Sequence, residues 1–290
     1  SYGMVSVLDG RELDDTVKDH RNGQPVIAIS ATAVIALIYV YFSAIQIVYL
    51  FAGYGTLPEG YTYAQYARQG FFQLLFICLM NLGLVLIGLG FFRESRILKG
   101  ILLVISLCTF VMIVSSAYRM LLYISVYYLT FLRIFVLWAL GVIALLMVGV
   151  VGKMLIHAFP LFRYGLAVTA CCYLVLSFSQ PDYWIARYNI SSYQKQDEEK
   201  RQEKMELDTW YLNTLSADAA PVIMNAENIR QYHDYEAIKE KWLKGEVKNI
   251  DTPDWQVSYI ILQAEKADKM SLRSYNFSRG YVKSALAEMQ

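Results

Sequence analysis

The chain has 290 residues, of which 56% are hydrophobic and 14% are aromatic, and its formal net charge is +1. This balance, without a concentrated basic patch, argues against a nucleic-acid-binding protein. Residues 1–179 hold 11 Lys or Arg and 7 Asp or Glu, whereas residues 180–290 hold 15 and 18. The sequence therefore predicts an all-α, polytopic membrane protein with a polar N-terminal segment (1–25), a transmembrane helical domain (26–179) and a soluble helical domain (180–290).

The first apolar run, Val26–Phe51, is uncharged over 26 residues. As a helix it would be about 39 Å long at about 1.5 Å per residue, which exceeds a hydrocarbon core of about 30 Å. This span must therefore tilt or protrude. Because the chain begins at Ser1 without an initiator Met or a signal-peptide pattern, we expect it to be a fragment with further spans upstream.

A turn-rich connection leads to Tyr61–Phe71 (YTYAQYARQGF), where three tyrosines and Arg68 precede a long apolar run. Tyrosine favours the membrane interface, and an arginine there lifts its guanidinium toward water, so this stretch predicts a helix that enters a bilayer. At helical spacing Tyr63, Tyr66 and Gly70 share one face. Two interpretations stay open: an aromatic belt with a helix-packing face, or a binding site that involves Arg68.

Four further apolar runs predict four more spans, which are Phe71–Phe92, Gly100–Tyr118, Ile134–Val151 and Tyr164–Phe178. The tyrosine-rich stretch Met120–Leu132 lies between the third and fourth of the five spans and is too short to cross a bilayer. We interpret it either as helix ends that protrude beyond the bilayer or as an interfacial helix.

Basic residues near the span ends predict the orientation, because short loops rich in Lys and Arg stay in the cytoplasm. One alternating set of ends is rich in them: Arg11, Lys18, Arg21, Arg93, Arg96, Lys99, Lys153 and Arg163. The other set holds Arg68, Arg119 and Arg133. We therefore expect the first set in the cytoplasm, and the tyrosine motif and residues 180–290 outside the cell membrane.

From Gln180 onward the pattern is that of soluble helices. Amphipathic or capped stretches predict helices over Lys195–Thr214, Asn225–Lys244, Asp254–Met270 and a last helix capped by Asn276 or Ser278. At about 110 residues this domain is large enough for a small core of its own.

Motifs that carry known chemistry are missing from the sequence. His20, His157 and His233 lie far apart, and there is no G-x-S-x-G elbow, P-loop or dinucleotide-binding glycine pattern. We expect no enzyme activity, no metal and no cofactor. The spans contain no Asp or Glu, which argues against ion-coupled transport.

The polar residues inside the spans are neutral ones that commonly hydrogen-bond between helices: Gln46, Gln73, Asn81, Ser106, Thr109, Ser115 and Ser116. Four glycines in the spans, Gly83, Gly88, Gly141 and Gly149, are predicted to allow close helix packing.

Four arginines are predicted at the outer face, where the charge bias normally depletes basic residues: Arg68, Arg119, Arg133 and Arg187. One interpretation is structural, with hydrogen bonds to carbonyls at span ends or pairing with acids such as Glu59 and Asp182. The other is a binding site, since guanidinium groups match phosphate and carboxylate bidentately. A ring of them walled by Tyr63 and Tyr66 would suit an anionic lipid headgroup or a glycan-lipid phosphate.

Six stretches together resemble a known family: FSAIQIVYLF (Phe42–Phe51), LPEGYTYAQYARQGFFQLL (Leu57–Leu75), SAYRMLLY (Ser116–Tyr123), YYLTFLR (Tyr127–Arg133), WIARYNI (Trp184–Ile190) and YLNTLSADAAP (Tyr211–Pro221). The family comprises bacterial multi-pass membrane proteins, found in many Gram-positive species and described only as a domain of unknown function. The resemblance covers about residues 26–221 and implies further spans before Val26. It implies no established activity, substrate or catalytic residues.

The sequence thus favours a non-enzymatic integral membrane component of the bacterial cell envelope with a sensing or assembly role. Its outer face would bind an anionic lipid, a partner membrane protein or a second copy of the chain. The alternative is a transporter or lipid-handling protein that moves a substrate through the helical bundle. A wide polar cavity between the spans would favour the alternative, whereas a dry, glycine-packed bundle with an outer cleft would favour the first function.

Overall fold

The computed structural model describes residues 23–52, 63–156, 158–195 and 207–224, together with 259, 262, 263, 266 and 277–288. The regular structure of these residues is helical, apart from one isolated bridge between Gly23 and Phe92. The predicted all-α fold is confirmed. The predicted helix Asn225–Lys244 and the acidic and basic residues of the segment 1–22 lie outside the described residues.

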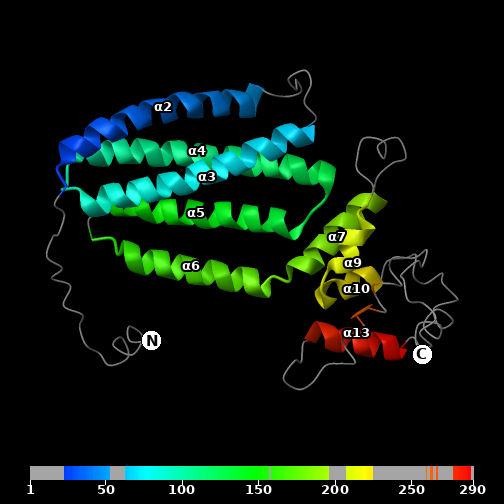
Figure 1. The fold of residues 1–290 in the computed structure, drawn as a ribbon. Coiled ribbons are helices and arrows are strands. Elements are labelled where there is room, and N and C mark those ends of the chain that lie inside the picture. The colour runs from blue at the N-terminus through cyan, green and yellow to red at the C-terminus, as the bar shows by residue number, and fades with distance from the viewer. Residues whose placement is uncertain are drawn as a thin grey trace, which may run out of the picture.

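Five long helices lie alongside one another (Figure 1). They are α2 (Pro25–Ala52), α3 (Tyr63–Phe91), α4 (Arg96–Tyr127), α5 (Phe131–Leu155) and α6 (Leu161–Phe178). Each is long and apolar enough to cross a bilayer, as the five predicted spans require. Consecutive helices run in opposite directions. We call the end where α4 passes into α5 the junction end, and the other, where α3 passes into α4 and α5 into α6, the basic end.

Helix α4 is longer than the sequence analysis predicted. It has 32 residues, or about 48 Å of helix. Most of Met120–Leu132 continues α4 beyond the predicted stop at Tyr118, and α5 begins at Phe131. Met120 and Ile124 are buried and extend the packed face of α4 by two turns. The structure therefore has this stretch as a continuation of α4 and the start of α5, and not as a separate interfacial helix.

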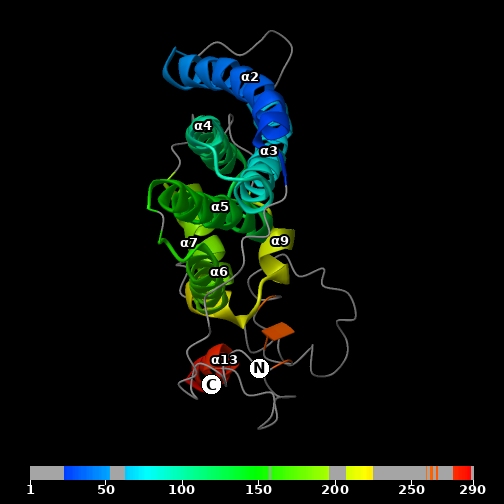
Figure 2. The same cartoon turned by 90° about the vertical axis from the view of Figure 1, so that its left-hand side faces the viewer.

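Helix α4 is also the centre of the bundle, because it packs against α2, α3 and α5. The largest fully buried side chains of the bundle are Leu102, Ile105, Met112, Met120, Leu140 and Met147. Helix α6 packs mainly on α5, and none of its 18 residues, all of them described, is buried. Figure 2 shows this order, with α2 and α6 on opposite sides of the bundle.

Three of the predicted polar contacts between helices are present, and in one of them the Ser116 hydroxyl of α4 donates to the Phe71 carbonyl of α3 at 3.4 Å. The Asn81 amide donates to the Thr109 hydroxyl at 3.0 Å and so joins α3 to α4. The Gln46 side chain oxygen of α2 accepts a hydrogen bond from the Ser115 hydroxyl of α4 at 2.7 Å. Gln73 is exposed and takes no such part in the bundle core.

Short helices gather beside the junction end (Figures 1 and 2). They are α7 (Pro181–Gln194), α9 (Thr209–Thr214), the 3-10 helix η1 (Ala217–Ala219), α10 (Ala220–Met224) and α13 (Phe277–Glu288). We call them, with Tyr259 and Gln263, the junction domain. Its core is separate from that of the bundle and includes Ile185, Leu212, Ile223, Tyr259 and Val282.

The predicted soluble helices are present in part. Of Lys195–Thr214, the described residues form a helix over Thr209–Thr214. Within Asp254–Met270, residues 259, 262, 263 and 266 are helical. The last helix begins at Phe277, between the two residues predicted to cap it.

Candidate functional site at the junction end

The four predicted arginines lie on elements that meet at the junction end (Figure 1). Arg68 is in the second turn of α3, Arg119 in the last third of α4, Arg133 in the first turn of α5 and Arg187 in the second turn of α7. Tyr63 and Tyr66 share the start of α3 with Arg68, and the side chains of all three lie outside the described residues.

Arg133 holds the end of α4. Its Nη1 donates hydrogen bonds to the backbone carbonyls of Tyr127 and Tyr128. Its guanidinium lies 4.5 Å from the centre of the Tyr123 ring, which in turn stacks on the Tyr127 ring at 4.8 Å. Carbonyls at a helix C-terminus lack partners within the helix, so a cation there stabilises the helix end. Arg133 thus has the structural role that was one of the two interpretations.

The turn between α4 and α5 is strained at Tyr128. This residue has φ 62° and ψ −179°, a backbone conformation that is essentially restricted to glycine and costs about 1–3 kcal/mol. Tyr128 is also buried. A strained residue of this kind persists where surrounding contacts fix the backbone on both sides.

Arg133 provides such contacts at Tyr127 and Tyr128, and Asn189 of α7 provides them at Leu129. The Leu129 backbone N–H donates to Asn189 Oδ1 at 2.7 Å, and Asn189 Nδ2 donates to the Leu129 carbonyl at 2.9 Å. Asn189 is only 3% exposed. From α9, the Tyr211 hydroxyl accepts the backbone N–H of Phe131 at 2.9 Å. We call this set of contacts the joint, because it fixes the junction domain to the α4–α5 turn.

Asn189 and Tyr211 were not among the predicted site residues. They are 60 and 80 residues from their partners along the chain. The available signal was that both belong to the motifs WIARYNI and YLNTLSADAAP, on which the family resemblance rests. Their roles depend on a tertiary contact that helical periodicity does not encode.

Arg119 joins two spans. Its Nη2 donates to Gln46 Oε1 at 2.9 Å, and the same oxygen accepts the Ser115 hydroxyl. Gln46 is 5% exposed. Because Arg119 belongs to α4 and Gln46 to α2, this hydrogen bond fixes the junction-end half of α2 against α4.

Arg187 lies on the surface. Its Nη1 donates to the Tyr183 hydroxyl at 3.3 Å, and its guanidinium lies 5.6 Å from the Trp184 ring centre. Trp184 is 52% exposed. The neighbouring acid, Asp182, accepts the backbone N–H of Ser216 at 3.0 Å. The structure thus brings the arginines to one end of the bundle but gives Arg119, Arg133 and Arg187 different partners.

Burial raises the pKa of two phenols in the junction domain. Burial raises the pKa of Tyr211, and the carboxylates of Asp182 and Asp208 act in the same direction. Burial also raises the pKa of Tyr259, as do Asp182 and Asp218. Tyr259 donates its hydroxyl proton to the Ser216 carbonyl at 2.5 Å, which requires the neutral phenol.

A groove between α3, α5 and α6 has a volume of about 540 Å³ and apolar walls. It is therefore unlike the wide polar cavity expected of a protein that moves polar substrates. Among the residues that the structure describes, no three His, Cys, Asp or Glu side chains are grouped as a metal site would require.

Comparisons with known proteins point to one family. No curated protein and no solved structure matches the chain. A family described as Domain of unknown function (DUF4153) matches residues 4–226, which include all five spans, α7, α9 and α10. The chain belongs to this family of unknown function.

Proposed function

We propose that the protein is a non-enzymatic integral component of the bacterial cell envelope with a sensing or assembly role. In this proposal the junction domain lies outside the cell membrane. An anionic lipid headgroup or a partner protein binds at the junction end, through Arg68 and Arg187 with Tyr63 and Tyr66, while Arg119 and Arg133 keep the span ends in place.

The joint is the observation that supports this function. Asn189 and Tyr211 tie a soluble domain to the backbone of the turn that follows the central helix α4. An event that moves α7 must therefore either move this turn or break buried hydrogen bonds, which cost about 1–3 kcal/mol each when left without a partner. Such a connection suits a protein in which binding at the junction domain changes the arrangement of the spans.

Arg187 supports the location of the binding surface. It is exposed on α7 beside the exposed ring of Trp184, a residue type that favours the membrane interface. A guanidinium beside an indole at this depth can reach a lipid phosphate while the ring contacts the acyl region.

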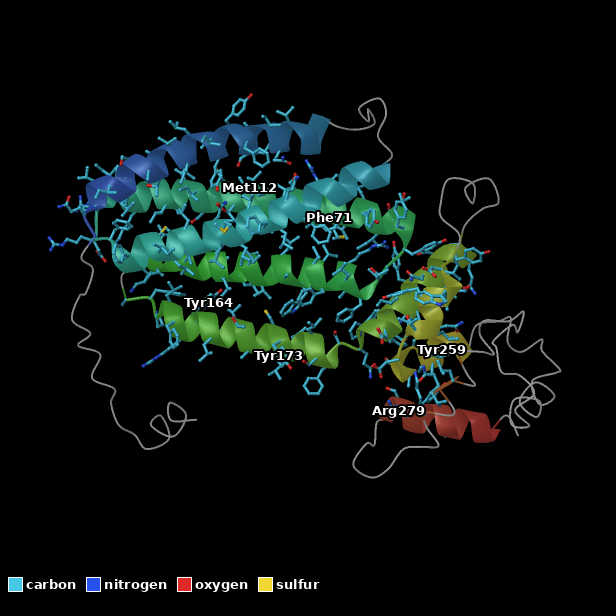
Figure 3. All side chains as sticks on the ribbon, viewed as in Figure 1. Phe71, Met112, Tyr164, Tyr173, Tyr259 and Arg279 are labelled. Atoms are coloured by element: carbon cyan, nitrogen blue, oxygen red, sulfur yellow. The ribbon has the colours of Figure 1, made fainter. Side chains whose placement is uncertain are left out.

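The binding surface can be tested by mass spectrometry of the purified full chain in nanodiscs of equal parts phosphatidylglycerol and phosphatidylcholine. Arg68→Gln with Arg187→Gln should reduce the retained phosphatidylglycerol by about tenfold, since two charge-assisted contacts are lost. Arg279→Gln removes a charge from α13, away from the spans (Figure 3), and should retain the parent amount.

Equal phosphatidylglycerol in the double variant and the parent would contradict lipid binding at this surface. If the double variant loses a co-purified membrane protein while its retained lipid is unchanged, the ligand of this surface is a partner protein and not a lipid.

The second candidate function is a transporter or lipid-handling protein. The apolar groove between α3, α5 and α6 favours the lipid-handling form of this candidate. Movement of fluorescent phospholipid between the leaflets of proteoliposomes containing the protein would support it over the first.

A further inference from the structure

The groove between α3, α5 and α6 lies toward the basic end of the bundle. Its walls are formed by Leu82 and Leu86 of α3, Leu146 and Val150 of α5, and Leu161, Phe162, Gly165, Leu166 and Thr169 of α6. The one hydroxyl on the wall, that of Thr169, donates to the Gly165 carbonyl at 2.8 Å and is thereby satisfied within α6. The walls therefore offer a ligand apolar contact and no strong hydrogen bond.

The length of the groove suits part of a hydrocarbon chain. The groove residues of α6, from Leu161 to Thr169, extend over about 12 Å of helix axis, close to the half-thickness of a hydrocarbon core of about 30 Å. The groove has a volume of about 540 Å³.

The packing of α6 on α5 keeps the groove open. The Tyr164 ring occupies the space beside Gly149, where an added Cβ would be 2.3 Å from the ring. The Tyr164 hydroxyl donates to the Leu145 carbonyl at 2.9 Å. One residue further along α6, Gly165 lines the groove, and a Cβ there would lie 3.7 Å from Leu146. Tyr164 (labelled in Figure 3) thus packs closely on α5, whereas Gly165, the next residue, leaves room in the groove for an added methyl at ordinary contact distance.

Positive charge marks the end of the groove. Arg163 is exposed in the first turn of α6. Lys153 follows Leu146 and Val150 at helical spacing on α5, so it continues the same wall toward the basic end. The other described charges at this end are Arg93, Arg96 and Lys99, with Glu94 paired to Lys99 at 3.0 Å. A phosphate is favoured where the apolar walls stop.

We infer that this groove binds one acyl chain of an anionic phospholipid from the leaflet at the basic end, with the phosphate beside Arg163 and Lys153. This site is distinct from the proposed surface at the junction end, and either can exist without the other. The lipid fills a gap that α6 leaves because it packs mainly on α5 alone.

The test is native mass spectrometry of the full chain in detergent, with added phosphatidylglycerol or with phosphatidylcholine carrying the same acyl chains. Gly165→Leu fills the groove and should reduce bound phosphatidylglycerol by one molecule per chain. Arg163→Gln should leave the groove open, so that the chain retains lipid but loses its preference for phosphatidylglycerol by about tenfold.

Two variants serve as controls. Gly165→Ala adds a methyl at ordinary contact distance and should retain the lipid. Gly141→Leu places the same bulk on α5 where an added Cβ meets no atom within 4 Å, and should also retain it. If Gly165→Leu shows no cooperative thermal unfolding and is therefore not folded, Thr169→Phe takes its place as the variant that fills the groove, from the other end.

Equal lipid retention in the parent and in the groove-filling variant would overturn the inference. A dimer in the parent spectrum that Gly165→Leu converts to monomer would also overturn it, because a second copy of the chain would then occupy the groove. Loss of phosphatidylglycerol from the junction-end arginine variant, but not from Gly165→Leu, would refute this site and leave the proposed function in place.

Discussion

At the scale of single residues, the arginines at the junction end have different roles. The sequence placed Arg68, Arg119, Arg133 and Arg187 at one face but left their roles open between structure and binding. Arg133 bonds two carbonyls and Arg119 bonds Gln46, as a structural role requires. Only tertiary contacts separate these two from the exposed Arg187, and charge patterning contains no information about such contacts.

Tyr259 predicts an alkaline limit to the stability of the junction domain. Its pKa in the folded protein is raised above the ordinary tyrosine value of about 10, mainly by burial. The stabilising contribution of the neutral phenol is therefore complete below about pH 10 and is lost as the pH rises further, since the unfolded chain then releases the proton first. When the thermal unfolding midpoint is measured from pH 8 to 11, the midpoint temperature should decrease once the pH exceeds about 10.

Tyr259→Phe should flatten this alkaline decline. At neutral pH the same variant should be less stable by about 1 kcal/mol, because the hydrogen bond to Ser216 is lost. Tyr281→Phe, which removes an exposed phenol from α13, is the control and should keep the parent profile. A steep decline that persists in Tyr259→Phe would assign the transition to another group.

At the scale of elements, apolar length predicted the five spans but not their ends. The prediction ended the third span before Arg119 because a charge interrupts the apolar run. The helix continues because Met120 and Ile124 remain buried and because Arg119 finds a partner on α2. The true stop, Tyr128 in a glycine-like conformation, has no local signature, since tyrosine is a residue that the conformation disfavours.

The glycines of α5 give a prediction at this scale. Gly149→Ala should displace the Tyr164 ring and break its bond to the Leu145 carbonyl, at a cost of about 1–3 kcal/mol. Gly141→Ala on the same helix meets no atom within 4 Å and should be neutral or stabilising by up to about 1 kcal/mol. Denaturation of the purified protein by SDS titration measures both.

Of the four glycines predicted to pack closely, Gly88 and Gly149 do so, and Gly83 and Gly141 face open space. Equal stability of Gly149→Ala and Gly141→Ala would show that α6 adjusts freely to α5. A glycine in a span is therefore a candidate for close packing, whereas the contact itself depends on which helix lies opposite.

At the scale of the whole molecule, the joint connects two cores that the chain builds separately. One core lies in the bundle and the other in the junction domain. The family match ends at residue 226, whereas Tyr259 and Val282 complete the core of the junction domain. The end of the chain thus contributes to a domain whose other helices belong to the matched region.

Asn189→Ala should uncouple these two parts. It leaves the Leu129 N–H and carbonyl without their side-chain partner and should destabilise the protein by about 2–3 kcal/mol. Hydrogen exchange measured by mass spectrometry should become faster at Leu129 and in α7, with little change in the middle of α4.

The matched control is Ser191→Ala on the same helix, where the hydroxyl bonds only the local Tyr188 carbonyl at 3.2 Å among the contacts described for it. Its exchange rates should equal those of the parent. Unchanged exchange at Leu129 in Asn189→Ala would mean that the α4–α5 turn is held without α7.

The unequal lengths of α2 and α6, which lie on opposite sides of the bundle, have a consequence for the surrounding lipid. Helix α2 is about 42 Å long and helix α6 about 27 Å. Lipids along the perimeter of the bundle therefore meet a wall of uneven height, with the lowest section at α6. The bilayer must thin locally on that side or the whole bundle must tilt. Both responses relieve hydrophobic mismatch at a cost of a fraction of a kcal/mol per Å. We therefore expect the tilt angle of the bundle to depend on the thickness of the membrane.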